Sequence, residues 1–175
     1  MIFRETPLEG AWLIGIEPIT DQRGFFARVG CEREARAVGI DVRWVQANVS
    51  RNRRCGTLRG MHWQEPDFEA KLVRVTRGAI WDVIVDIRPR SATYRQHLAV
   101  ELSEDNGQSL FVPEGFAHGF VTLCDHTEVS YQMSRFYVPE QARGFRYDDP
   151  AIGIPWPQGD KILSPRDRDL PPFGS

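Results

Sequence analysis

The chain has 175 residues, of which 41% are hydrophobic, and we expect a single domain over residues 1–175 because this length is short for two. Its 22 basic and 24 acidic residues nearly balance, which excludes an overall positive field for binding nucleic acid or an anionic membrane surface. With no apolar run long enough to span a bilayer and no N-terminal pattern typical of a signal peptide, we expect a cytoplasmic protein with no membrane partner.

The first regular element that the sequence predicts is a short helix at residues 32–38, ended by Gly39. Strand patterns dominate after it, and the clearest is the alternation of large apolar side chains over residues 81–87. Arg77 and Gly78 separate these residues from the strand pattern at 71–76, and together they predict a hairpin turn. Further strand patterns lie at residues 97–102, 108–112, 116–123 and 128–134.

Short strands separated by segments rich in turn-forming residues predict a mainly β protein of the jelly-roll kind, a sandwich or barrel that wraps two sheets together. From residue 139 onward the composition shifts to Pro, Gly, Asp and Arg, and the prolines forbid long regular elements. We therefore expect a jelly-roll core over residues 21–138 and an irregular, proline-rich tail over residues 139–175 that wraps it.

The segment CGTLRGMHWQ is the most informative for chemistry because it places Arg59 and His62 on one predicted strand. Side chains three residues apart on a regular strand face opposite ways, so both reach one ligand only if the strand contains a bulge. Gly60, which lies between them, permits such a bulge. The alternative is a buried, structural His62 with Arg59 in solvent, and the spacing alone does not decide between them.

Three further side chains are candidates for the same site, each with a structural alternative. Lys71 begins the next strand pattern and could return beside His62 across a hairpin, although a solvated lysine at a strand edge is commoner. His118 shares a strand face with two phenylalanines and points inward, which a core histidine would also do. Tyr131 alternates into an apolar face, where its hydroxyl needs a partner, but core packing explains it too.

A metal site is the main rival for a β-barrel with inward-facing histidines. Metal-binding cupins, small barrels of this shape, present a His-x-His pair, a nearby Glu and a third His. Here Gln64 takes the place of the second His, and two histidines fall short of the three protein ligands usual in a catalytic site. We therefore expect no metal, and we interpret the three widely spaced cysteines as reduced and structural. They are Cys31, Cys55 and Cys124.

Seven stretches between residues 21 and 167, taken together and in order, resemble the dTDP-4-dehydrorhamnose 3,5-epimerase family. They are DQRGFFAR, QANVS, TLRGMHWQ, KLVRVTRGAIWDVIVDIR, GFAHGF, the pair Tyr131 and Tyr137, and LSPRD. The resemblance implies a double-stranded β-helix, or jelly roll, and a homodimer whose N-terminal segments reach into the partner's active site. It also implies epimerisation of a nucleotide-linked 4-keto-6-deoxyhexose without a metal or other cofactor.

The resemblance also implies a role for each matching residue. His62 would be the general base, Asp167 its orienting carboxylate, Tyr131 the acid on the opposite face, and Lys71 the stabiliser of the enolate oxygen on C4. Tyr137 would stack on the nucleobase. The other substrate-binding residues would be Arg23, Gln46, Asn48, Arg59, His118 and Arg166. These roles suit the chemistry, because a C4 ketone acidifies C3 and C5, so inversion needs only a base, an acid and a positive group at the oxygen.

Two departures from the family pattern bear on the substrate. Arg28 stands where the family usually carries a glutamate, beside the expected nucleotide pocket, and we expect it to bind substrate there. Ala142 replaces another glutamate. Both leave the base, acid and lysine intact. The open alternatives are therefore inversion of C3 or C5 alone, a ketoisomerase, and a different nucleotide such as CDP. A metal-dependent cupin and a non-catalytic module that binds sugar nucleotides are further from the pattern.

Overall fold

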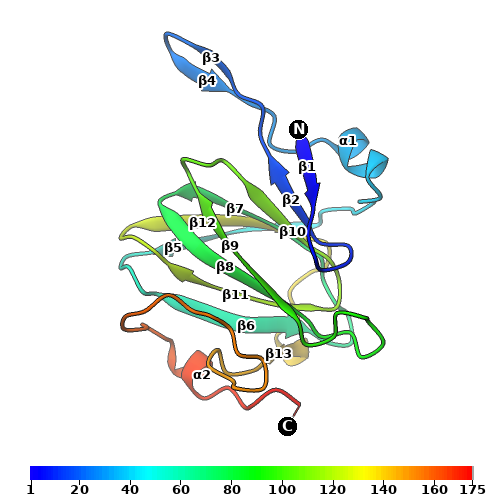
Figure 1. The fold of residues 1–175 in the computed structure, drawn as a ribbon, viewed down its shortest axis with the longest axis vertical. Helices are drawn as coiled ribbons and strands as arrows, with labels where there is room; N and C mark the ends of the chain where they lie inside the picture. The colour runs from blue at the N-terminus through cyan, green and yellow to red at the C-terminus, as the bar shows by residue number, and fades with distance from the viewer. Residues whose placement is uncertain (175) are drawn as a thin grey trace.

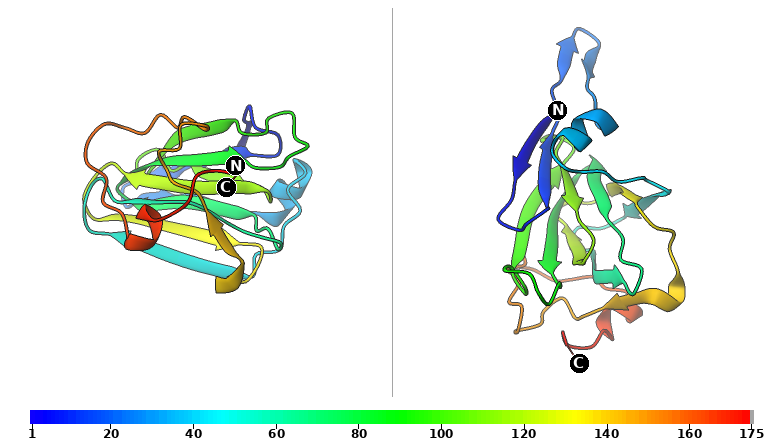
Figure 2. Two further views of the ribbon diagram at one scale, coloured as in Figure 1. Left: turned by 90° about the horizontal axis from the view of Figure 1, so that it is seen from below. Right: turned by 90° about the vertical axis from the view of Figure 1, so that its right-hand side faces the viewer.

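The computed structural model describes residues 1–174, so Ser175, the last residue of the predicted tail, lies outside the described residues. Two sheets face each other as the layers of a sandwich (Figure 2). The six-stranded sheet runs β1 (Ile2–Glu5), β2 (Trp12–Gly15), β10 (Ser109–Val112), β7 (Lys71–Arg77), β12 (Thr127–Met133) and β5 (Gln46–Asn52). The five-stranded sheet runs β13 (Ala142–Gly144), β6 (Leu58–Gln64), β11 (Phe116–Thr122), β8 (Ala79–Asp86) and β9 (His97–Ser103). The predicted mainly β, jelly-roll fold is confirmed.

The predicted hairpin at Arg77 and Gly78 is wrong, because β7 and β8 belong to different sheets. Gly78 has a φ of +77° and turns the chain from one sheet to the other. The same change of sheet occurs between β9 and β10 and between β11 and β12. A hairpin and a crossover use the same turn residues, so local sequence does not distinguish them. β6 and β7 also belong to different sheets, so Lys71 approaches His62 from the facing sheet and not across a hairpin.

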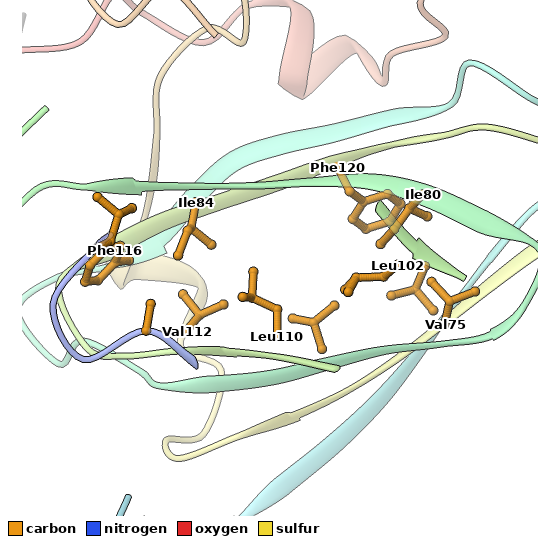
Figure 3. Close-up of a cluster of buried hydrophobic side chains, with 12 residues drawn as sticks. Val75, Ile80, Ile84, Leu102, Leu110, Val112, Phe116 and Phe120 are labelled. Atoms are coloured by element: carbon orange, nitrogen blue, oxygen red, sulfur yellow. The ribbon is translucent and has the colours of Figure 1, made fainter. Parts of the chain in front are cut away.

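Apolar side chains from both sheets fill one end of the sandwich (Figure 3). Leu110 and Val112 of β10 meet Ile84 of β8 and Phe116 of β11, and all four are at most 2% exposed. This burial is the main source of stability, at roughly 2 kcal/mol for each large apolar side chain. The other end of the space between the sheets carries polar side chains instead, and it forms the pocket described below.

The N-terminal region adds strands outside the range of 21–138 predicted for the core. β2 pairs with β10 and so extends the six-stranded sheet, although its short pattern gives little signal. Next, β3 (Ile19–Asp21) and β4 (Gly24–Phe26) form a separate hairpin that projects away from the body (Figure 1). The predicted helix is confirmed as α1 (Glu32–Ala37), and Gly39, with a φ of +86°, follows its end.

The tail packs over the outer face of the five-stranded sheet. Phe145, Ile152 and Phe173 of the tail join Met61 and Val85 of the sheet in one apolar cluster. Regular structure in this segment is short, as its prolines predict: a 3₁₀ turn at Pro139–Gln141, strand β13, and helix α2 (Pro165–Arg168). This packing carries α2 to β6, beside the pocket (Figure 1). Within residues 1–174, no helix has the length and apolar character that a membrane crossing requires.

Candidate active site

A polar pocket lies between the two sheets and consists of two adjoining hollows of about 460 and 300 Å³. His62 of β6, Lys71 of β7, Tyr131 of β12 and Arg166 of α2 line both hollows. Side chains from both sheets and from the tail, far apart in the sequence, therefore converge on one space. A total of this size suits a ligand larger than a simple sugar.

A bulge in β6 brings Arg59 and His62 to the same side, a possibility that the sequence left open. His118 pairs with His62 and Phe120 with Arg59, so Gly119 of β11 alone opposes Gly60 and Met61 of β6. Gly60 has a φ of +129°, and a Cβ there would lie 2.5 Å from the Cα of Gly119. Only glycine fits this position, because both the backbone conformation and the neighbouring strand exclude a side chain.

His62 is held by Asp167, which α2 presents from the tail. The Nε2 atom of His62 lies 2.6 Å from Oδ1 of Asp167, and the Asp167 side chain is only 7% exposed. Burial raises the pKa of Asp167, but hydrogen bonds from His62 and Ser164 and the charges of His62 and Arg166 outweigh burial and lower it. An ionised Asp167 fixes the Nε2–H tautomer of neutral His62, which leaves Nδ1 free to accept a proton.

Tyr131 lines both hollows from the six-stranded sheet, facing the sheet that carries His62. Its ring packs against the apolar core, and burial raises the pKa of its hydroxyl, although the charge of Arg59 opposes that shift. The hydroxyl therefore stays protonated near neutral pH and can give up a proton to a strongly basic carbanion. A histidine and a tyrosine, both able to exchange protons, thus lie on opposite sheets of one pocket.

Two further side chains of the pocket, a lysine and a histidine, each contact a buried carboxylate. Lys71 pairs with Glu69, with Nζ 2.9 Å from Oε1, and both side chains are at most 9% exposed. His118 pairs with Asp82, with Nε2 2.8 Å from Oδ1, and the Asp82 side chain is fully buried. The pocket also holds the guanidinium groups of Arg51, Arg59 and Arg166, so its net character is cationic.

Ten of the twelve residues predicted for the site line the pocket, and two do not. Those that do are His62, Lys71, Tyr131, Asp167, Gln46, Asn48, Arg59, His118, Tyr137 and Arg166. Arg23 lies on the projecting hairpin, where its side chain is 84% exposed and pairs only with Asp21. Arg28, just after the hairpin, pairs with Glu34 of α1. Neither arginine lines the pocket of its own chain.

Comparison with known proteins decides the family. The model of the family described as dTDP-4-dehydrorhamnose 3,5-epimerase matches residues 5–175. The enzyme of that name from Methanothermobacter thermautotrophicus is 45% identical over 98% of this chain and 94% of its own length. The chain belongs to the dTDP-4-dehydrorhamnose 3,5-epimerase family. It is thus a carbohydrate epimerase, as the sequence motifs indicated.

Two solved structures of the family resemble this epimerase closely. The Bacillus anthracis dTDP-4-dehydrorhamnose 3,5-epimerase, with TDP and PPi bound, has a TM-score of 0.96 at 40% identity and covers 98% of this chain and 99% of its own. The Legionella pneumophila dTDP-6-deoxy-D-glucose-3,5-epimerase, in complex with dTDP-4-keto-L-rhamnose, has a TM-score of 0.93 at 36% identity, covering 98% and 92%. The family's architecture is therefore kept over nearly the whole chain.

Several residues that hold the pocket of this epimerase in place were not predicted from its sequence. Glu69 and Asp82 supply the carboxylates for Lys71 and His118, and Oδ1 of Asn52 accepts a 2.8 Å hydrogen bond from Nε of Arg59. A signal existed for Glu69, because residues two apart on an extended segment share a face. No comparable signal existed for Asn52, which reaches Arg59 from the other sheet. Residues 1–174 contain no group of three or more His, Cys, Asp or Glu side chains placed to hold a metal ion.

Proposed function

We propose that this epimerase inverts C3, C5 or both of a dTDP-linked 4-keto-6-deoxyhexose, with His62 as the base and Tyr131 as the acid. The observation that carries the proposal is the position of His62, with its Asp167 partner, and Tyr131 on opposite sheets of one pocket. His62 removes the proton on the carbon beside the ketone, and the electron pair moves to the C4 oxygen to form an enolate. Tyr131 then returns a proton from the other face, which inverts the carbon.

Lys71 and the arginines suit the charges of this reaction and its substrate. Lys71 lines both hollows together with His62 and Tyr131, and it supplies a positive group for the enolate oxygen. Arg59 and Arg166 suit the diphosphate, because a guanidinium offers paired hydrogen bonds to phosphate oxygens. Tyr137 is 46% exposed, and its hydroxyl accepts a 3.3 Å hydrogen bond from Nη1 of Arg166, so its ring is available to stack on the thymine.

Deuterium exchange tests the function directly. A proton NMR time course in deuterium oxide, with dTDP-4-keto-6-deoxyglucose, should show solvent deuterium entering C3, C5 or both. The Tyr131→Phe variant should keep exchange better than inversion, because the base removes its proton before the acid returns one. The Tyr147→Phe variant, changed outside the pocket, should behave as wild type. If wild-type protein shows no exchange on either dTDP or CDP substrates, the proposal is wrong.

We further propose that the enzyme works as a homodimer in which each β3–β4 hairpin completes the partner's pocket. The hairpin projects from the body and exposes Phe25 and Phe26 by 61% and 74%, as expected of a segment that another chain covers (Figure 1). Inactive His62→Ala subunits mixed with subunits lacking residues 20–25 should regain activity, because a mixed dimer holds one complete site. We place the enzyme in the cytoplasm, where its three free cysteines stay reduced.

A further inference from the structure

Glu69 is a buried carboxylate in the pocket with no part in the proton transfers above. It is 5% exposed and lies two residues before Lys71, in the segment that leads into β7. Its Oε1 atom lies 2.9 Å from Nζ of Lys71, and its Oε2 atom accepts a 3.0 Å hydrogen bond from the backbone N–H of Gln64. Each oxygen therefore has its own partner, one on β7 and one on β6.

This arrangement links Lys71 to the strand that carries His62. Gln64 lies at the end of β6, two residues beyond His62, so the Glu69 carboxylate bridges the facing sheets at the pocket. The backbone between Glu69 and Lys71 is also held in place, since the N–H of Ala70 donates a 2.8 Å hydrogen bond to Oγ of Ser134. An ammonium has three N–H donors, and the ion pair with Glu69 uses one of them. The others remain available to a ligand.

The charges around Lys71 give the carboxylate a second effect. Lys71 is 7% exposed and shares the pocket with the cationic side chains of Arg59 and Arg166. A buried ammonium among like charges is unfavourable unless an opposite charge balances it. Glu69 supplies that charge at hydrogen-bonding distance, whereas Asp167 is engaged by His62. The pocket thus contains two carboxylates with different partners, Asp167 on the proposed base and Glu69 on the lysine.

We propose that Glu69 is a positioning residue for the epimerisation, holding the Lys71 ammonium where the C4 oxygen becomes negative. The inference rests on the proposed function, since it assigns Lys71 to that oxygen. Glu69 itself touches no reacting atom. Its contribution is realised when the enolate forms, so its loss should lower kcat while leaving KM for the nucleotide sugar nearly unchanged.

Two substitutions separate this role from simple support of the fold. Glu69→Gln keeps the size of the side chain and an oxygen for the Gln64 N–H, but removes the charge. It should lower kcat about tenfold with KM within about twofold of wild type. Glu69→Asp keeps the charge and shortens the reach, so it should retain more of kcat than Glu69→Gln. The reverse order would show that Glu69 serves only as a hydrogen-bond acceptor, and would overturn the proposal.

A double-variant cycle tests whether Glu69 acts through Lys71. In a Lys71→Gln background, adding Glu69→Gln should change the rate of deuterium exchange by less than about twofold. An equal loss in both backgrounds would overturn the proposal. Glu114→Gln is the matched control, because it removes a carboxylate from an exposed ion pair with Arg135, at 3.6 Å, and should leave kcat unchanged. Absence of exchange in wild type would instead refute the function itself, and with it the role of Glu69.

Discussion

The strand that carries His62 and the β3–β4 hairpin each hold a glycine with nearly the same φ, but in opposite surroundings. Gly60 on β6, next to the pocket residue Arg59, has a φ of +129°, and Gly24 at the hairpin turn has a φ of +123°. A Cβ on Gly60 would meet the Cα of Gly119 at 2.5 Å, whereas a Cβ on Gly24 would meet nothing within 4 Å. The pocket is therefore fixed by packing within the chain, while the hairpin is shaped by its turn alone.

This difference separates the predicted site residues into two groups. The residues of the pocket have partners in the same chain, such as Asp167 for His62 and Glu69 for Lys71. Arg23 on the hairpin has only its neighbour Asp21. Proton transfer requires side chains held in place, and the pocket provides them. The hairpin can contribute only if another chain orders it, which is why its role depends on the proposed dimer.

The largest expected effect is at the centre of the pocket. His62→Ala removes the proposed base, and we expect deuterium exchange into the sugar to fall by about a thousandfold or more. The measurement is the NMR time course in deuterium oxide. His97→Ala, on β9 and outside the pocket, is the control and should exchange at the wild-type rate. An active His62→Ala enzyme would mean that another residue is the base. It would also mean that the side chains held in place in this pocket are not those that transfer the proton.

The two glycines offer a direct comparison of the regions. Gly24→Ala imposes only the strain of its backbone conformation, whereas Gly60→Ala adds a clash with the neighbouring strand. We expect Gly60→Ala to lower the free energy of unfolding by about 2 kcal/mol more than Gly24→Ala. Urea denaturation of both variants measures this difference. Equal losses would mean that β6 and β11 can move apart at the bulge, and that the pocket is less rigid than its packing indicates.

The sequence predicts the strands of the body well, because their apolar alternation reflects burial on a sheet face. It identifies Gly60 as a position that permits a bulge, but the spacing of Arg59 and His62 alone does not predict that one forms. The predicted hairpin at Gly78 is wrong, because a turn that carries the chain into the other sheet uses the same residue types as a turn between two strands of one sheet. β5 gives no strand signal of its own, because its pocket-facing positions, such as Gln46 and Asn48, are polar.

The remaining parts of the site depend on long-range contacts that no local pattern encodes. Asp167 reaches His62 across 105 residues of sequence, and only the family resemblance identified it. Its position depends on tail packing, in which the N–H of Arg146 donates to the carbonyl of Pro171 at 2.9 Å. Residue types alone also left His62 undecided between a base and a core histidine, since either role buries part of the ring.

A buried carboxylate in the body and an exposed one in the hairpin should differ in their effect on stability. Burial raises the pKa of Asp86, but hydrogen bonds from Arg88, Ser91 and Thr93 outweigh it and lower the pKa from 3.8 to about 2. Folding therefore favours the ionised form. This stabilisation is present above about pH 4 and is lost as the pH falls toward 2. At about 1.4 kcal/mol per pKa unit, the loss is about 2 kcal/mol.

Asp86→Asn should remove that part of the acid sensitivity, which urea denaturation between pH 5 and 2 would measure. Asp21→Asn is the control from the hairpin. Its carboxylate is 48% exposed, and although hydrogen bonds from Arg23 lower its pKa, solvent screens the pair. We therefore expect the pH dependence of unfolding to stay close to that of wild type. A similar pH dependence in both variants would mean that burial does not determine how much each carboxylate–arginine pair contributes to the free energy of unfolding.

The smallest expected effect concerns substrate binding by the hairpin. Arg23→Ala should raise KM for the nucleotide sugar about tenfold and leave kcat within about twofold, because a substrate contact far from the reacting carbons stabilises substrate and transition state alike. Arg33→Ala, an exposed arginine on α1, is the control. Steady-state kinetics measures both. An unchanged KM for Arg23→Ala would mean that the hairpin takes no part in binding, and that one chain supplies the whole site.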